Sequence, residues 1–82
     1  MEQTVQKLRD NLASCISDLK RDHQIMSDTD VAHDMGYIRG LSSAIKTAFD
    51  PEYYKYDYPE CRQIDRLVER IENMCWESGS RF

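Results

Sequence analysis

The sequence predicts an all-α fold, in which an antiparallel helical hairpin is followed by a third helix to form a small three-helix bundle. The first observation is that apolar residues recur every three or four positions in three stretches, the spacing that places side chains on one stripe of a helix. The second is that capping and helix-breaking residues separate these stretches. We therefore expect helices at about 4–25, 30–49 and 59–76 in a single domain spanning all 82 residues. A core of this size is marginal alone, so we also expect the protein to be oligomeric.

The first expected helix is amphipathic. Its opposite face alternates positive and negative side chains, which is typical of a solvated surface. Thr4 or Gln3 is the expected cap at its start. The apolar stripe of this helix consists of Val5, Leu8, Leu12, Cys15 and Leu19.

The second expected helix has the clearest start signal in the chain. The run from Ser27 to Asp30 carries four short side chains with oxygen atoms, which can accept the free amides at a helix N-terminus. The helix should end at Asp50, because Pro51 disfavours helical geometry in the preceding residue. Since the link to the first helix is short, the two should form an antiparallel hairpin. The apolar stripe of this helix is Val31, Met35, Ile38, Leu41, Ile45 and Phe49.

A row of small residues also runs along the second helix at intervals of four. A glycine inside a helix costs about 1 kcal/mol relative to alanine, so two glycines in this row need a compensating interaction. We expect another helix to pack closely at the middle of the row, and the first helix, the third helix and a second subunit are all candidates. The alternative is that the glycines are tolerated on an exposed face. The row, called the small-residue ridge below, consists of Ala32, Gly36, Gly40, Ala44 and Ala48.

The segment 50–58 holds four of the chain's five tyrosines between two prolines. Tyrosine offers a large contact area at low entropic cost and keeps a polar tip, so tyrosine clusters recur at protein interfaces. The segment is therefore a candidate partner-binding loop. The alternative is that it folds back over the hairpin and satisfies each hydroxyl locally. The tyrosines are Tyr53, Tyr54, Tyr56 and Tyr58.

The third helix should begin at Pro59, with Asp57 as its cap. Its apolar stripe is Cys61, Ile64, Val68, Ile71 and Cys75, and residues 77–82 should form a frayed tail. A basic row on the same helix is a candidate nucleic-acid contact, although acidic residues flank it and the net charge of −4 argues against a broad phosphate-binding surface. The basic row is Arg62, Arg66 and Arg70.

The residues that could act in catalysis or bind a metal do not occur at the spacings that such sites require. The three cysteines lie on apolar helical positions without a CxxC motif, which indicates buried free thiols in a reducing cytosol. His23 and His33 lack metal-ligand spacing, and Gly36 and Gly40 lie within a helix instead of a phosphate-binding loop. We expect no enzymatic activity, no metal and no cofactor. The N-terminal stretch lacks an apolar run, so we expect no signal peptide or membrane span and a cytoplasmic location.

The run from His33 to Ile45, HDMGYIRGLSSAI, resembles a pattern in small helical-hairpin proteins of tailed bacteriophages. In those proteins a charged first helix precedes a second helix that reads roughly G-x-I-x-G-L-x-x-A-I/L. The resemblance covers about thirteen residues and carries no catalytic or binding residue across. It implies a small viral product that acts in a bacterial cytoplasm or is built into a virion.

These observations lead to three functional hypotheses. The first is a non-enzymatic interaction or assembly protein that binds a protein partner or itself, as a phage structural or accessory component. The second is an inhibitor or regulator of a bacterial host or defence enzyme, because an acidic protein with an aromatic loop could occupy a basic nucleic-acid channel. The third is weak nucleic-acid binding through the basic row.

Overall fold

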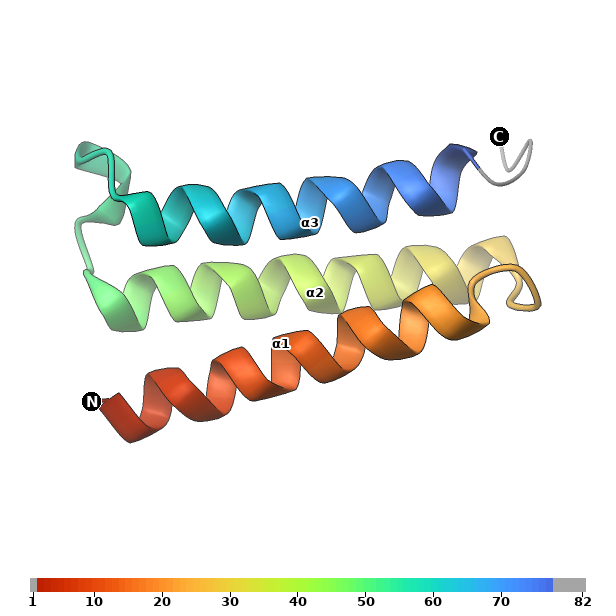
Figure 1. The fold of residues 1–82 in the computed structure, drawn as a ribbon, viewed down its shortest axis with the longest axis horizontal. Coiled ribbons are helices and arrows are strands. Elements are labelled where there is room, and N and C mark those ends of the chain that lie inside the picture. Colours follow the sequence, from red (N-terminus) through yellow and green to blue (C-terminus); the bar gives the residue numbers. More distant parts are fainter. Residues whose placement is uncertain (1, 78–82) are drawn as a thin grey trace.

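The computed structural model describes residues 2–77, and this part of the chain is a bundle of three α-helices (Figure 1). They are α1 (Glu2–Asp22), α2 (Asp28–Phe49) and α3 (Pro59–Glu77), with a short 3-10 helix η1 (Tyr53–Lys55) between α2 and α3. No strand occurs within residues 2–77. Consecutive helices run in opposite directions, so α1 and α3 are parallel to one another. The predicted all-α fold with a hairpin and a third helix is confirmed.

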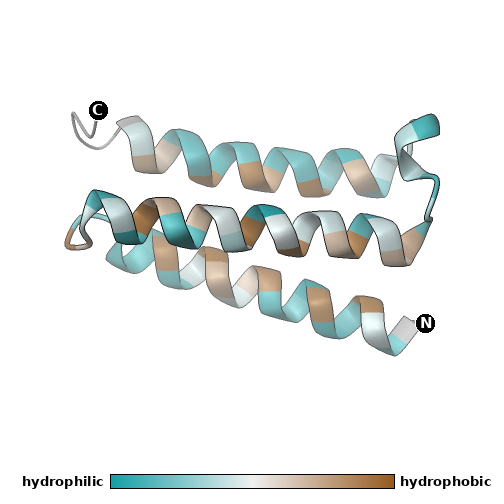
Figure 2. Cartoon of the chain, turned by 180° about the vertical axis from the view of Figure 1, so that it is seen from behind, coloured by the Kyte–Doolittle hydropathy of each residue, from teal (hydrophilic) through white to brown (hydrophobic). Residues whose placement is uncertain are grey.

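The core forms where the three apolar stripes meet, and α2 lies centrally between its neighbours. Val31, Ile38 and Ile45 on α2 are fully buried, as is Ile71 on α3. Figure 2 shows the apolar bands of α1 and α3 turned toward α2. Full burial of such a side chain contributes about 1.5–3 kcal/mol, so these few residues account for much of the stability. The remaining core residues are Leu12, Ile16, Leu19, Met35, Leu41, Ile64, Val68 and Cys75.

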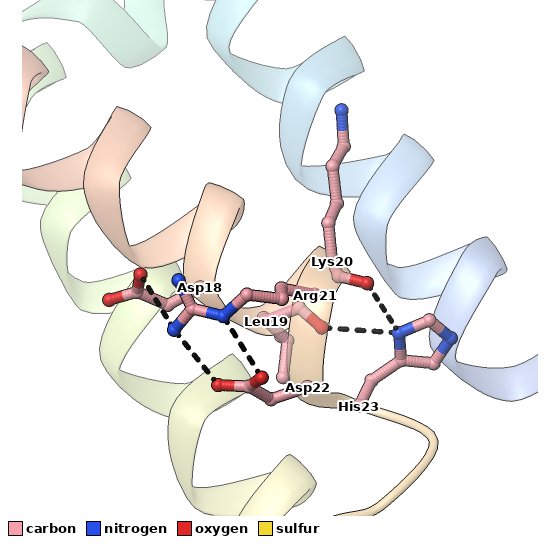
Figure 3. A network of polar contacts seen from close by, with 6 residues as sticks. All are labelled: Asp18, Leu19, Lys20, Arg21, Asp22 and His23. Carbon is pink, nitrogen blue, oxygen red and sulfur yellow. Dashed lines mark hydrogen bonds and ion pairs between the residues drawn. The ribbon is translucent and has the colours of Figure 1, made fainter.

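Helix α1 ends three residues earlier than periodicity predicts, and His23 explains why. The imidazole folds back so that Nδ1 lies 3.1 Å from the carbonyl oxygens of Leu19 and Lys20 (Figure 3). Carbonyl oxygens only accept, so Nδ1 carries the proton and donates to both. Those carbonyls lie at the C-terminus of α1, where intrahelical partners run out. Ile25, which lies in the turn that follows, is 86% exposed and contributes nothing to the stripe.

Helix α2 begins with the predicted cap. Ser27 is the N-cap residue, and its Oγ accepts a hydrogen bond from the N–H of Asp30 (3.1 Å). The helix starts at Asp28, two residues before the expected position. Asp28 and Asp30 place negative charge in the first turn, where the helix dipole favours it. The helix ends at the residue before Asp50, as the following proline requires.

Helix α3 begins at Pro59 as predicted, but Asp57 does not take the expected capping role. Asp57 lies two residues before the helix, and its carboxylate pairs instead with Nε of Arg62 at 3.1 Å. The tail was expected at 77–82, but Glu77 still belongs to α3, and residues 78–82 lie outside the described residues. Within residues 2–77, no helix combines the length and the apolar character needed to cross a membrane.

Candidate interaction surfaces

The small-residue ridge lies on the outer side of α2. A Cβ atom added at Gly36 or at Gly40 would meet nothing within 4 Å. Ala32 and Ala44 are also exposed, and Ala48 is half-buried. The expectation that α1 or α3 packs closely on this ridge is therefore wrong. Both helices pack on the buried stripe at the opposite side of α2, so no helix within residues 2–77 covers the ridge.

The outer face of α2 lacks charge between Gly36 and Thr47. Gly36, Gly40, Ser43, Ala44 and Thr47 are exposed along it, and all have small side chains or none. The two cations of this stretch project from the flank instead, where they pair with carboxylates of α3. The result is an exposed strip of small residues, bordered by the exposed ring of Tyr37, that a second helix could approach with little desolvation cost.

The tyrosine loop divides into an anchored part and an outward part. Tyr58 is the main anchor, because its ring packs edge-on against Phe49 with centroids 5.1 Å apart. Its hydroxyl donates to the carboxylate of Asp50, which also accepts the N–H of Glu52 (2.8 Å). The bond to Asp50 raises the pKa of Tyr58 to about 12, and the same bond, with that from Glu52, lowers the pKa of Asp50. Tyr58 therefore closes the loop onto the end of α2.

Tyr53 is half-buried, with Nζ of Lys46 5.2 Å from its ring centre. Tyr54 and Tyr56, by contrast, are 71% and 57% exposed. Lys55 lies over the ring of Tyr54 at 5.8 Å. Of the four candidate partner-binding tyrosines, two are thus held within the loop and two face outward. Residue spacing could not separate them, because a proline-bounded loop has no fixed period.

The basic row on α3 faces away from the core. Arg62, Arg66 and Arg70 are exposed, but Arg62 is paired with Asp57. The charges of this row are therefore partly neutralised within the chain.

A groove of about 380 Å³ lies between α1 and α3, and sequence reasoning missed it. The only available signals were small residues on the flank of α1 and Leu67, which lies just outside the strict apolar stripe of α3. Leu67 is 43% exposed at the edge of the groove. The lining residues are Arg9, Leu12, Ala13, Ile16, Ser17, Lys20, Glu60, Gln63, Ile64 and Leu67.

The three cysteines are free thiols, with Cys61 and Cys75 buried and Cys15 half-buried. Burial raises the pKa of Cys15 and of Cys61, and nearby carboxylates add to both shifts. These groups are therefore protonated and weakly nucleophilic near neutral pH. Among the side chains that the structure describes, those of residues 3–76, no three His, Cys, Asp or Glu are grouped as a metal site would require.

Comparison with known proteins adds no further constraint: no family model, no curated protein and no solved structure matches this chain.

Proposed function

We propose that this chain is a non-enzymatic interaction protein that assembles with a second copy of itself or docks on another protein. The observation that carries the proposal is the outer face of α2, a strip of small residues with Gly36 and Gly40 open to solvent. The resemblance to phage hairpin proteins suggests a viral structural or accessory component, acting in a bacterial cytoplasm or within a virion.

Gly36 and Gly40 lower the helix stability of α2 in the isolated chain. Replacing both by alanine within a helix would stabilise the isolated chain by about 2 kcal/mol, and no neighbouring atom stands in the way. Nothing inside the described chain offsets this cost. Close approach of an external helix would offset it, because glycine lets two backbones come nearer than any side chain allows.

Sedimentation velocity over a wide concentration range tests this proposal. We expect wild-type protein to associate and the variant Gly36→Leu/Gly40→Leu to remain dissociated with an intact fold, because leucine fits the open space in the monomer but keeps a second helix away. Ser14→Leu adds a similar bulk to the exposed face of α1 and should leave association unchanged.

Docking on a different protein needs its own measurement. A photo-crosslinking residue at position 40 should give a discrete protein adduct that the same residue at position 14 does not. A monomeric wild-type protein that also gives no position-40 adduct would contradict the proposal.

The second candidate function is inhibition or regulation of a host or defence enzyme. Tyr54 and Tyr56 favour it, since both rings are exposed on a protein of net charge −4. Tyr54→Ser/Tyr56→Ser should abolish binding of such an enzyme while sparing the fold, whereas Tyr37→Ser, at an exposed tyrosine elsewhere, should have no effect. Equal binding by both variants would remove this candidate.

Nucleic-acid binding remains a third candidate, supported only by the exposed arginines of α3. Filter binding at low salt tests it, and Arg66→Ala/Arg70→Ala should weaken any retention. Absence of retention by the wild-type protein even at low salt would exclude it.

A further inference from the structure

We propose that the groove between α1 and α3 binds an amphipathic helix of a partner protein, one that carries acidic residues beside its apolar stripe. This inference rests on the proposed interaction role and adds the class of partner. It concerns a surface separate from the outer face of α2.

The floor of the groove is apolar and its edge is incompletely covered. Leu12, Ile16 and Ile64 are buried at the floor, while Leu67 remains 43% exposed at the α3 edge. Burying the rest of Leu67 would gain hydrophobic free energy for an apolar side chain placed against it.

The α1 wall of the groove has the length of a short helix and carries small side chains along its middle. Arg9 and Lys20 mark its two ends, and their eleven-residue separation corresponds to roughly 16 Å along the helix axis, about three turns. Between them, Ala13 and Ser17 present small side chains to the groove. A helix lying along the groove could therefore approach the middle of α1 closely while its ends face two cations. Figure 3 shows the Lys20 side chain extending on the side of α1 toward α3.

Charge indicates which kind of helix fits. Among the side chains of residues 3–76, no carboxylate lies within ion-pairing distance of Arg9 or Lys20, although Arg39 and Lys46 at the α2–α3 contact are both paired. Glu60 is the single carboxylate in the lining, against two cations. An occupant with carboxylates about eleven residues apart would complement Arg9 and Lys20, flanking an apolar stripe at helical spacing.

A second copy is a poorer occupant on the same grounds. A two-fold contact between grooves would place the same residues of both copies together. Four cations would then face only two copies of Glu60, and like charges across an interface oppose association.

Two synthetic peptides serve as the probes. Both are fifteen-residue helices with leucine at i, i+3, i+4 and i+7, and they differ only in having Glu or Lys at two positions eleven apart. In fluorescence anisotropy at low salt, we expect the Glu peptide to bind wild-type protein saturably and at least tenfold more tightly than the Lys peptide. Amide NMR shifts should map to the groove.

Charge reversal provides the decisive variant. Arg9→Glu/Lys20→Glu should invert the preference so that the Lys peptide binds more tightly. The matched control, Lys7→Glu/Arg66→Glu, makes the same charge change at exposed positions outside the groove and should keep the wild-type preference. Leu67→Gln should weaken binding of the Glu peptide, while Tyr37→Gln should not.

Four results would overturn the inference: no saturable binding of the Glu peptide, an unchanged preference in the reversed variant, NMR shifts outside the groove, or groove shifts that depend on protein concentration without peptide. The last result would assign the groove to a second copy. Gly36→Leu/Gly40→Leu should bind the Glu peptide normally even if it no longer assembles, so the failure of this inference and that of the proposed function can be told apart.

Discussion

The two sides of α3 contrast in how they meet the rest of the bundle. Toward α2, Arg39 donates two hydrogen bonds to Glu72 (3.0 and 2.6 Å) and Lys46 donates to Asp65 (2.6 Å), so charged side chains bridge the contact. Toward α1, a groove remains whose cations have no such partners among the described side chains, those of residues 3–76. Helix α1 carries four Lys or Arg residues and α2 carries two, so the number of cations does not explain why only those of α2 pair with α3. What matters is whether a carboxylate lies opposite each cation.

The two sides of α3 also differ in how completely the chain buries them. The α2–α3 contact combines fully buried aliphatic residues with bridging charges at its edge, so it is expected to be rigid. The α1–α3 side keeps an apolar surface that the chain alone does not fill. The α2 side of α3 therefore mainly stabilises the fold, while the α1 side includes the groove at which we propose that a partner binds.

The largest expected change in the free energy of unfolding comes from comparing two positions one turn apart on α3. Ile71 is fully buried and Leu67 is 43% exposed. We expect Ile71→Ala to lower the free energy of unfolding by about 3 kcal/mol through lost burial and a residual cavity. Leu67→Ala should lower it by less than about 1 kcal/mol. Urea denaturation measures both, and equal losses would show that the groove is closed in solution.

The outer face of α2 should respond in the opposite direction. Gly36→Ala/Gly40→Ala is expected to raise the free energy of unfolding of the monomer by about 2 kcal/mol, because alanine has the higher helix propensity and its Cβ meets open space. Ala44→Gly on the same face should lower it by about 1 kcal/mol. Denaturation at a concentration where the protein is monomeric checks both. A loss of stability in the double variant would mean that the ridge is covered.

A smaller effect concerns the charged edge of the α2–α3 contact. A double-mutant cycle of Arg39→Ala and Glu72→Ala should give a coupling free energy of about 0.5–1 kcal/mol, reduced by salt, since Arg39 is mostly exposed. The same cycle for Arg9 and Glu60 should give no coupling. Coupling in the second cycle would indicate that Arg9 pairs with Glu60 in solution.

The smallest effect is expected at the tyrosine loop and appears as a pH dependence. The bond between Tyr58 and Asp50 stabilises the fold below pH 10, and this contribution is lost as the pH rises toward about 12, because unfolding lets the phenol ionise earlier. On the acid side, the contribution of Asp50 is present above pH 4 and is lost as the pH falls through its lowered pKa.

Melting temperatures of Tyr58→Phe across this pH range check the prediction. The variant should lose the alkaline part and most of the acid part of the dependence. Tyr54→Phe, at an exposed ring of the same loop, should follow the wild-type curve. If the melting temperature of Tyr58→Phe depended on pH as that of the wild type does, the hydrogen bond would not be the cause of this pH dependence.

Much of the fold was predictable because it depends on local signals. Each of these signals acts within a few residues: the cap at Ser27, the helix break at Pro51 and the helix start at Pro59. The predicted starts of α2 and α3 therefore lie within two residues of the observed starts. The end of α1 was missed because His23 acts through its side chain, and a lone histidine carries no characteristic spacing. Periodicity identified the buried stripes but could not tell how many helices would cover each side of α2.

The candidate surfaces depend on that missing information. The row from Ala32 to Ala48 is the same sequence pattern whether a helix covers it or not, so its exposure could be learned only from the arrangement of all three helices. The groove is a property of two helices far apart in the chain, and no single stretch encodes it. The division of the tyrosine loop depends on contacts with the end of α2. The hydroxyl of Tyr58 donates to Asp50 and the ring of Tyr53 lies near Lys46, whereas Tyr54 and Tyr56 stay mostly exposed.

The three thiols give the molecule a built-in set of kinetic reporters. Cys15 lies on α1, Cys61 in the first turn of α3 and Cys75 near its last. Because a slow thiol reagent modifies a buried cysteine only after the surrounding structure opens, each labelling rate measures the opening of one region. Cys15 should react first and Cys75, which is fully buried, last. The order of labelling would rank the local stability of the bundle without adding any probe to it.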